Sequence, residues 1–340
     1  MLTSAVSRSD KSTTKIMSIP HGERLRIHLM NQVAVLMACT MFGVLVVIYS
    51  SFRGGVFSLY ELNTDAATTV PLLLAAAGQT IVLLRGGIDL SIGGVISLTT
   101  VLAATRFPGN DWSMACWIVA VVAIGGLAGA ANGLLISLLR LQPFLVTLAT
   151  WSMLAGTALI ILPTDGGHIP DGWTTAGNLT AVGLSTPVWI LILLGLFWCW
   201  FSRTRLGLAI RATGSAEKSA FLSGVSLPMI DISTYCLSGV FAALSGLFLV
   251  TQTATGSPTV GNDYILPTVA AAVIGGVSLF GGRGSLFGTI LGAAILTVIG
   301  NLVFALQISS FWQPVASGVV LLIAVLGSSL AERSANREGI

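Results

Sequence analysis

The chain has 340 residues, of which 54% are hydrophobic and 9% are charged. Soluble domains carry roughly 25% charged residues, so this composition excludes a water-soluble protein and indicates an integral protein of the lipid bilayer. The net charge of +3 is too small to indicate nucleic-acid binding. The four cysteines show no CxxC spacing, so no metal site, disulfide framework or cofactor is expected.

The N-terminal segment 1–32 is polar and contains five Lys or Arg residues. It predicts a cytoplasmic tail, disordered at its start. The first hydrophobic span is expected at residues 33–50. Segment 51–69 follows with one arginine and two acidic residues, a composition that favours a loop on the outer side of the membrane.

Two short hydrophobic segments come next, at 70–84 and 91–105, on either side of the glycine-rich sequence RGGIDL. Both are shorter than the roughly 20 residues that a spanning helix needs. Short, glycine-interrupted segments are typical of discontinuous helices beside a transport path. Later spans are expected at 116–139, 143–162, 188–201, 229–250, 265–280, from the turn GGRGS to residue 306, and at 312–330.

The distribution of positive charge predicts the orientation of these spans, about ten in all. Of the 16 Lys and Arg residues, Arg53 and Arg106 are the two that alternating loops assign to the outer side. Because cytoplasmic loops are enriched in Lys and Arg, both termini are expected in the cytoplasm. The fold class is therefore an all-α, polytopic membrane helical bundle, with a transmembrane domain at 33–330 and a cytoplasmic tail at 331–340.

Glycines recur at every fourth residue in two of the spans, five spans apart. They are Gly125, Gly129 and Gly133 in one span, and Gly284, Gly288 and Gly292 at the start of the other. Small residues at this spacing let helices approach closely in lipid. Because five is odd, the two copies would run in opposite directions, which is compatible with an inverted repeat.

Segment 202–228 is the longest polar interruption in the second half of the chain, and it lies between two hydrophobic spans. Its four cations, Arg203, Arg205, Arg211 and Lys218, predict a cytoplasmic loop. The same segment contains signals for a short helix. They are a Ser215 cap, Glu217 in the first turn, the small residues Ser219 and Ala220, apolar Phe221 and Leu222, and Gly224 as the stop. Such a helix facing the cytoplasm predicts a docking surface for a partner.

Asp89 is the one acidic residue near the middle of an apolar region. It has two interpretations. As a ligand it would bind an ion or solute, because acidic groups at membrane depth are usually functional. As a structural residue, Asp89 or Ser91 would cap the helix that begins the third span, with Arg85 as a partner. Asp231, near the start of a later span, is expected to be structural.

Several polar residues inside the spans have two interpretations as well. They either line a hydrophilic path for a polar solute or hydrogen-bond neighbouring helices. The full set of candidates for the path is Gln79, Asp89, Asn132, Phe144, Thr147 and Asn301.

Catalytic motifs are not apparent within the spans. The three histidines lie before the first span or in an expected outer loop. The glycine-rich turn at 276–282 lacks the lysine that a P-loop uses to reach phosphates. The chain is therefore expected to be no enzyme, and any ATP hydrolysis would occur on another polypeptide.

Four sequences together resemble the sugar-type bacterial ABC importer permeases, the family of the ribose permease. They are LRGGIDLSIGG, NGLLISLLRLQPFLVTLATWSMLAG, GSAEKSAFLSGV and IGGVSLFGGRGSLFGTILGA. The resemblance implies a type II importer-like permease of the bacterial inner membrane. It also implies a second permease subunit, identical or related, two cytoplasmic ABC ATPase domains, and a periplasmic solute-binding protein that delivers the solute.

The resemblance also implies that the loop at 202–228 carries the coupling helix that docks on the ATPase. Glu217, Ala220 and Gly224 occupy positions that match the family, whereas Phe221 replaces an arginine that is often found there. The expected function is ATP-driven import of a sugar or sugar-like polar solute. Two alternatives remain open, an ion-coupled secondary transporter, which would need acidic groups at mid-membrane, and a passive facilitator, which would need no docking helix.

Overall fold

A computed structural model describes residues 21–107, 111–309, 311–320, 322–323 and 326. The helices are α1 (His21–Phe52), α2 (Leu59–Arg85), α3 (Ser91–Arg106), α4 (Asp111–Leu139), α5 (Pro143–Ile161), α6 (Asp171–Gly177), α7 (Thr186–Phe201), α8 (Arg205–Ser215), α9 (Glu217–Leu222), α10 (Leu227–Thr253), α11 (Asn262–Ile274) and α12 (Leu286–Ala305). Two short antiparallel strands, β1 (Thr180–Ala181) and β2 (Leu184–Ser185), form a hairpin between α6 and α7. The expected all-α membrane class is confirmed.

The number of spanning helices is smaller than expected in the described part of the chain. Five helices are long and apolar enough to cross a membrane: α2, α4, α5, α10 and α12. Helices α7 and α8 form a sixth span if they are counted together, although the chain bends by 73° between them. The predicted count of about ten is therefore not confirmed. Most of the second half of the expected span at 312–330 lies outside the described residues.

The second span is longer than predicted. Instead of a segment at 70–84, α2 runs for 27 residues, and it includes most of the expected outer loop. Its start is capped by Ser58, whose Oγ accepts a hydrogen bond from the N–H of Glu61 at 3.2 Å. Polar residues in its first turns have partners elsewhere, since Asp65 accepts from Asn301 at 2.7 Å and Glu61 accepts from Arg53 at 2.7 Å. The short length expected for the next segment is confirmed, since α3 has 16 residues. Helix α11 has 13 residues and ends before the expected span at 265–280 does.

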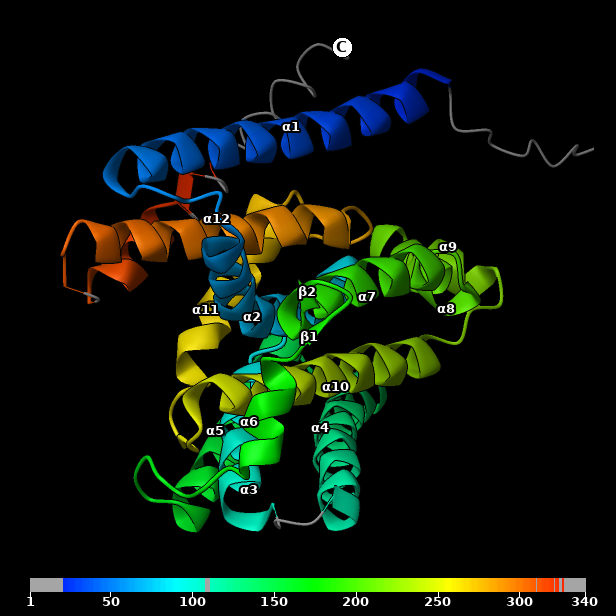
Figure 1. Ribbon diagram of the computed structural model, residues 1–340. Coiled ribbons are helices and arrows are strands. Elements are labelled where there is room, and N and C mark those ends of the chain that lie inside the picture. The colour runs from blue at the N-terminus through cyan, green and yellow to red at the C-terminus, as the bar shows by residue number, and fades with distance from the viewer. Residues whose placement is uncertain (1–20, 108–110, 310, 321, 324–325, 327–340) are drawn as a thin grey trace, which may run out of the picture.

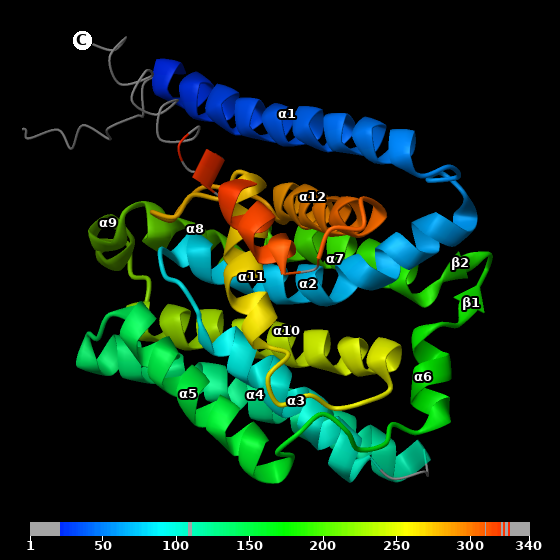
Figure 2. The same cartoon turned by 90° about the vertical axis from the view of Figure 1, so that its left-hand side faces the viewer.

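Helix α2 occupies the middle of the bundle. Every residue from 69 to 84 is buried, and the helix packs against α7, α10, α11 and α12. Figures 1 and 2 show the order of the layers, with α1 along one edge over α12, then α2, α7 and α11, then α10, and finally α3, α4 and α5. Helix α2 is therefore in contact with most of the bundle.

The glycine-rich faces bring helix backbones together. A Cβ at Gly129 of α4 would overlap the backbone at Tyr235 of α10, and one at Gly292 of α12 would overlap the backbone at Ala271 of α11. An inverted repeat of five spans would pair α4 with α12 and α10 with α2. Because the glycines of α4 pack on α10, those of α12 would then be expected to pack on α2. Gly292 of α12 packs on α11 instead, so the glycine faces do not support the repeat, which stays a prediction.

Candidate functional site

The polar loop between α7 and α10 folds into two short helices. Helix α8 begins after Thr204, whose Oγ1 accepts a hydrogen bond from the N–H of Gly207 at 3.1 Å. Its Arg211 guanidinium lies 5.5 Å from the ring centroid of Trp198 in α7, a cation–π contact that holds α8 against the membrane helix. The loop is therefore an ordered part of the fold. It lies at one end of the molecule in both views (Figures 1 and 2).

The start of α9 confirms the predicted first-turn position of Glu217 and corrects the predicted cap. Glu217 is its first residue, as expected, but Ser215 is not its cap. Ser215 is the last residue of α8 and donates its hydroxyl to the carbonyl of Arg211 at 2.9 Å, while Ala216 connects the two helices. The serine hydroxyl is thus used by the preceding turn, a backbone competition that is common for serine.

Gly224 terminates α9 as predicted. It adopts a left-handed conformation with φ of +85°, which glycine tolerates without strain. Its N–H donates to the carbonyl of Phe221 at 2.9 Å, and the N–H of Val225 donates to the carbonyl of Ala220 at 3.2 Å. This pair of bonds is a Schellman motif, so the chain turns sharply back toward α10.

The tip of α9 presents apolar side chains outward. Phe221 is 61% exposed and Leu222 is 76% exposed, whereas Ala220 packs inside. Lys218 and Ser219 are exposed beside them. In a membrane protein such exposed apolar side chains face either lipid or a partner protein.

The carboxylate of Glu217 contacts the membrane helices through an ion pair. Its Oε2 accepts from Nη2 of Arg85, at the end of α2, at 3.0 Å. Nε of the same arginine donates to Oδ1 of Asp231, near the start of α10, at 2.7 Å. Arg85 was expected to pair with Asp89, and that expectation is wrong. The structural interpretation of Asp231 is supported by its ion pair.

Close backbone contacts join the end of α8, the end of α2 and the loop between α11 and α12. Gly214, next to the end of α8, lies so near Leu84 of α2 that a Cβ would overlap the Leu84 carbonyl oxygen. That carbonyl accepts from the N–H of Gly282, in the loop between α11 and α12, at 2.8 Å. A Cβ on Gly281 would come within 2.9 Å of the Gly214 carbonyl oxygen. We call these residues, Leu84, Gly214, Gly281 and Gly282, the glycine junction.

Comparison with known proteins supplies the family. A family model described as "Branched-chain amino acid transport system / permease component" matches residues 63–325. The chain belongs to this permease family. The permease is 35% identical over 291 residues to the ribose import permease protein RbsC of Escherichia coli strain K12, which covers 83% of this chain and 90% of that protein.

Other relatives are named for different sugars. The D-allose transport system permease protein AlsC of Escherichia coli is 31% identical, covering 84% of this chain and 89% of that protein. The fructose import permease protein FrcC of Rhizobium meliloti is 30% identical, covering 80% and 78%. No solved structure matches the chain. The resemblance to ribose-type ABC permeases is confirmed at the level of the family, and the chain is a multi-pass membrane transport component, not an enzyme.

Asp89 of the permease lies in a buried hydrogen-bond network between α2 and α3. Its Oδ1 accepts from the backbone N–H and the hydroxyl of Ser91, and its Oδ2 accepts from Ser238 of α10 at 2.7 Å. The Ser91 hydroxyl accepts from Asn132 of α4 at 3.0 Å, and Asn132 accepts from Thr150 of α5. This network links four helices, α3, α4, α5 and α10, and supports the structural interpretation of Asp89. Its role as a ligand in the path stays a prediction.

The remaining path candidates differ in their surroundings. Thr147 donates to the Pro143 carbonyl at 2.9 Å, and Asn301 donates to Asp65 at 2.7 Å. Their role in a path stays a prediction. Gln79 is fully buried, yet neither of its amide atoms has a hydrogen-bond partner among the described residues. Phe144, near the cytoplasmic end expected for α5, is 49% exposed.

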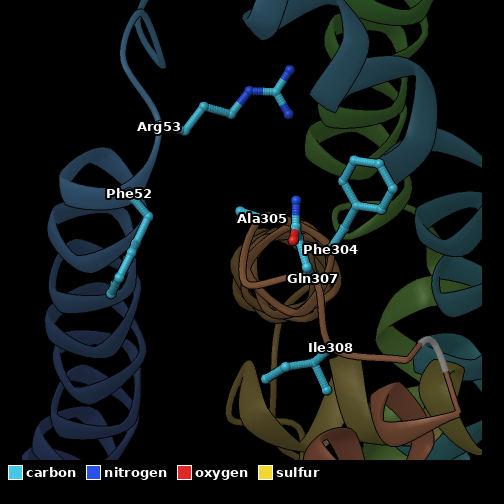
Figure 3. Close-up of a pocket in the computed structure, with 6 residues that line it drawn as sticks. All are labelled: Phe52, Arg53, Phe304, Ala305, Gln307 and Ile308. Carbon is cyan, nitrogen blue, oxygen red and sulfur yellow. The ribbon is translucent and has the colours of Figure 1, made fainter.

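A crevice of about 510 Å³ lies at the opposite end of the molecule from α9. Figure 3 shows its lining, in which the Arg53 side chain, just after the end of α1, extends toward residues at and after the end of α12. The charge of Arg53 is matched by Glu61 at 2.7 Å. The crevice therefore offers little unmatched charge.

Proposed function

We propose that the chain is the membrane-spanning permease subunit of an ATP-driven importer for a sugar or a sugar-like small polar solute. The observation that carries the proposal is α9, a short helix with an exposed apolar tip in the cationic loop between two apolar segments. The names of the related permeases, for ribose, allose and fructose, support a sugar as the class of solute. The solute would be delivered by a periplasmic binding protein.

The proposed mechanism is alternating access driven from the cytoplasm. Two ATPase domains would each hold a coupling helix, formed by α9 (Glu217–Leu222), in a complex that contains a second permease subunit. Phe221 and Leu222 would supply the apolar contact, because covering exposed apolar side chains lowers the free energy of the complex. ATP binding and hydrolysis would move the helices, and the bundle would open alternately to each side. The orientation follows from the positive charge of the loops, with both termini in the cytoplasm.

Gln79 is the residue we propose for direct contact with the solute. A buried amide without a partner is unfavourable in a static interior, typically by about 1–3 kcal/mol. Exposure to a hydroxyl-rich solute during transport would give it both a donor and an acceptor.

Uptake by proteoliposomes tests the proposal. The chain is reconstituted with a candidate ATPase subunit and a candidate binding protein from the same organism, and uptake of radiolabelled D-ribose, D-allose and D-fructose is measured with internal ATP. We expect uptake of at least one sugar that requires ATP and is insensitive to an uncoupler. Uptake that continues without ATP and stops with the uncoupler would support the ion-coupled alternative and contradict the proposal. An ATPase subunit with an inactivated Walker motif is the control.

A further inference from the structure

Arg85, at the end of α2, contacts acidic side chains of both α9 and α10. We propose that Arg85 is a positioning residue that passes the movement of α9 to α2 and α10 together, an inference that rests on the proposed function. Its two nitrogens, Nε and Nη2, contact the Asp231 and Glu217 carboxylates at 2.7 and 3.0 Å. The guanidinium has a rigid planar fork, so a displacement of one partner reorients the contact with the other.

The two ion pairs differ in how readily they part. The side chains of Arg85 and Asp231 are only 13% and 8% exposed, whereas that of Glu217 is 56% exposed. Separating a buried pair leaves uncompensated charges, while an exposed pair contributes little to stability. The pair to Asp231 therefore keeps the ends of α2 and α10 joined, while the pair to Glu217 attaches α9 to this joined end from its exposed side.

The glycine junction adds direct backbone contact between the α8–α9 segment and the end of α2. Since Gly214 leaves no room for a Cβ against Leu84, a shift of α8 toward α2 meets backbone directly. The hydrogen bond from Gly282 to the Leu84 carbonyl adds the loop that leads into α12. Movement of the α8–α9 segment is thus delivered to the end of α2 from two sides.

The helices that receive this movement carry the interior polar groups. Helices α2 and α10 have 27 residues each, and they pack along each other. Gln79 lies on α2, and Ser238, the partner of Asp89, lies on α10. The connection through Arg85 therefore ends on the two helices where a polar path would have to open.

Pulsed EPR distances on the reconstituted complex test the inference. The four native cysteines are replaced by serine, and spin labels are placed at Leu59, at the far end of α2, and at Ile160, near the end of α5, both of which are exposed. Distances are recorded without nucleotide and after trapping with ATP and vanadate. The variants are E217Q, R85Q/D231N, which removes the buried charges as a pair, and the triple combination. K218Q, on the same helix, is the control.

The expected result is a shift of about 2 Å or more on trapping in the unmodified chain and in K218Q, the scale of helix shifts in switching proteins. We expect this shift to be lost in E217Q and in R85Q/D231N, with no further change in the triple variant, although the ATPase remains bound in a pull-down. A shift that persists in both variants, or an unmodified complex that binds the ATPase but shows no shift, would overturn the role of Arg85. Failure of the unmodified chain to bind any ATPase would overturn the proposed function as well.

Discussion

Gly214 of α8 lies directly against the carbonyl group of Leu84 in α2, with no space for a side chain between them. Small residues permit this kind of backbone contact, which is a principal means of helix association in membranes. The contact places the loop at 202–228 against the central helix of the bundle. It also explains why this part of the loop is ordered although it is polar and lies between two apolar segments.

Gly214→Ala is expected to destabilise the protein by about 1–3 kcal/mol, because the new methyl group must displace backbone rather than a flexible side chain. Thermal unfolding of the purified protein in detergent measures the change. Gly156→Ala in α5 is the matched control, since nothing lies within 4 Å of its Cβ position, and it should be neutral or stabilising by up to about 1 kcal/mol. Equal melting temperatures for the two variants would contradict the close contact.

Gln79→Met is expected to have opposite effects on stability and transport. Methionine has a similar length but no polar atoms, so it removes a buried amide without partners and should raise stability by about 1–2 kcal/mol. Uptake in the proteoliposome assay should fall, because the solute loses a donor and an acceptor. Normal uptake with raised stability would instead assign Gln79 to the static interior.

Asp89→Asn tests the structural role of the buried carboxylate. The amide retains one acceptor oxygen where the carboxylate has two, so a donor from Ser91 or Ser238 loses its partner and stability should fall by about 1–3 kcal/mol. Ser238→Ala removes one donor and leaves the contacts with Ser91, so its loss should be smaller. A variant D89N with unchanged melting temperature and abolished transport would identify Asp89 as a ligand in the path.

Hydropathy predicted the positions of most apolar helices because their lipid-facing and interior sides are both apolar. The span expected at 143–162 corresponds to α5, for example, and that at 188–201 corresponds to α7. The start of α2 could not be predicted in the same way. Its polar residues look like a loop in the sequence, and only the folded chain supplies Asn301 as a partner for Asp65.

In the loop at 202–228, too, features set by neighbouring residues were predicted and contacts with distant residues were not. Glu217 and Gly224 were predicted correctly because a first-turn acid and a left-handed glycine are local signals. The cap at Ser215 was wrong by one residue, since α8 continues through that serine. The partner of Glu217 is 132 residues away in the sequence, so Arg85 could not be assigned to it from spacing alone.

Co-purification of the ATPase subunit with the chain tests the central claim most directly. A candidate ATPase subunit from the same organism is co-expressed with the tagged permease, and the amount retained is measured for the unmodified chain, for the α9 variant F221D/L222D, and for V182D. Val182 is a control on the β-hairpin, where it is 92% exposed. We predict that the unmodified chain and V182D retain the ATPase, and that F221D/L222D retains about tenfold less, since buried apolar anchors dominate such interfaces. An ATPase that never binds the unmodified chain, or that binds F221D/L222D equally well, would contradict the account.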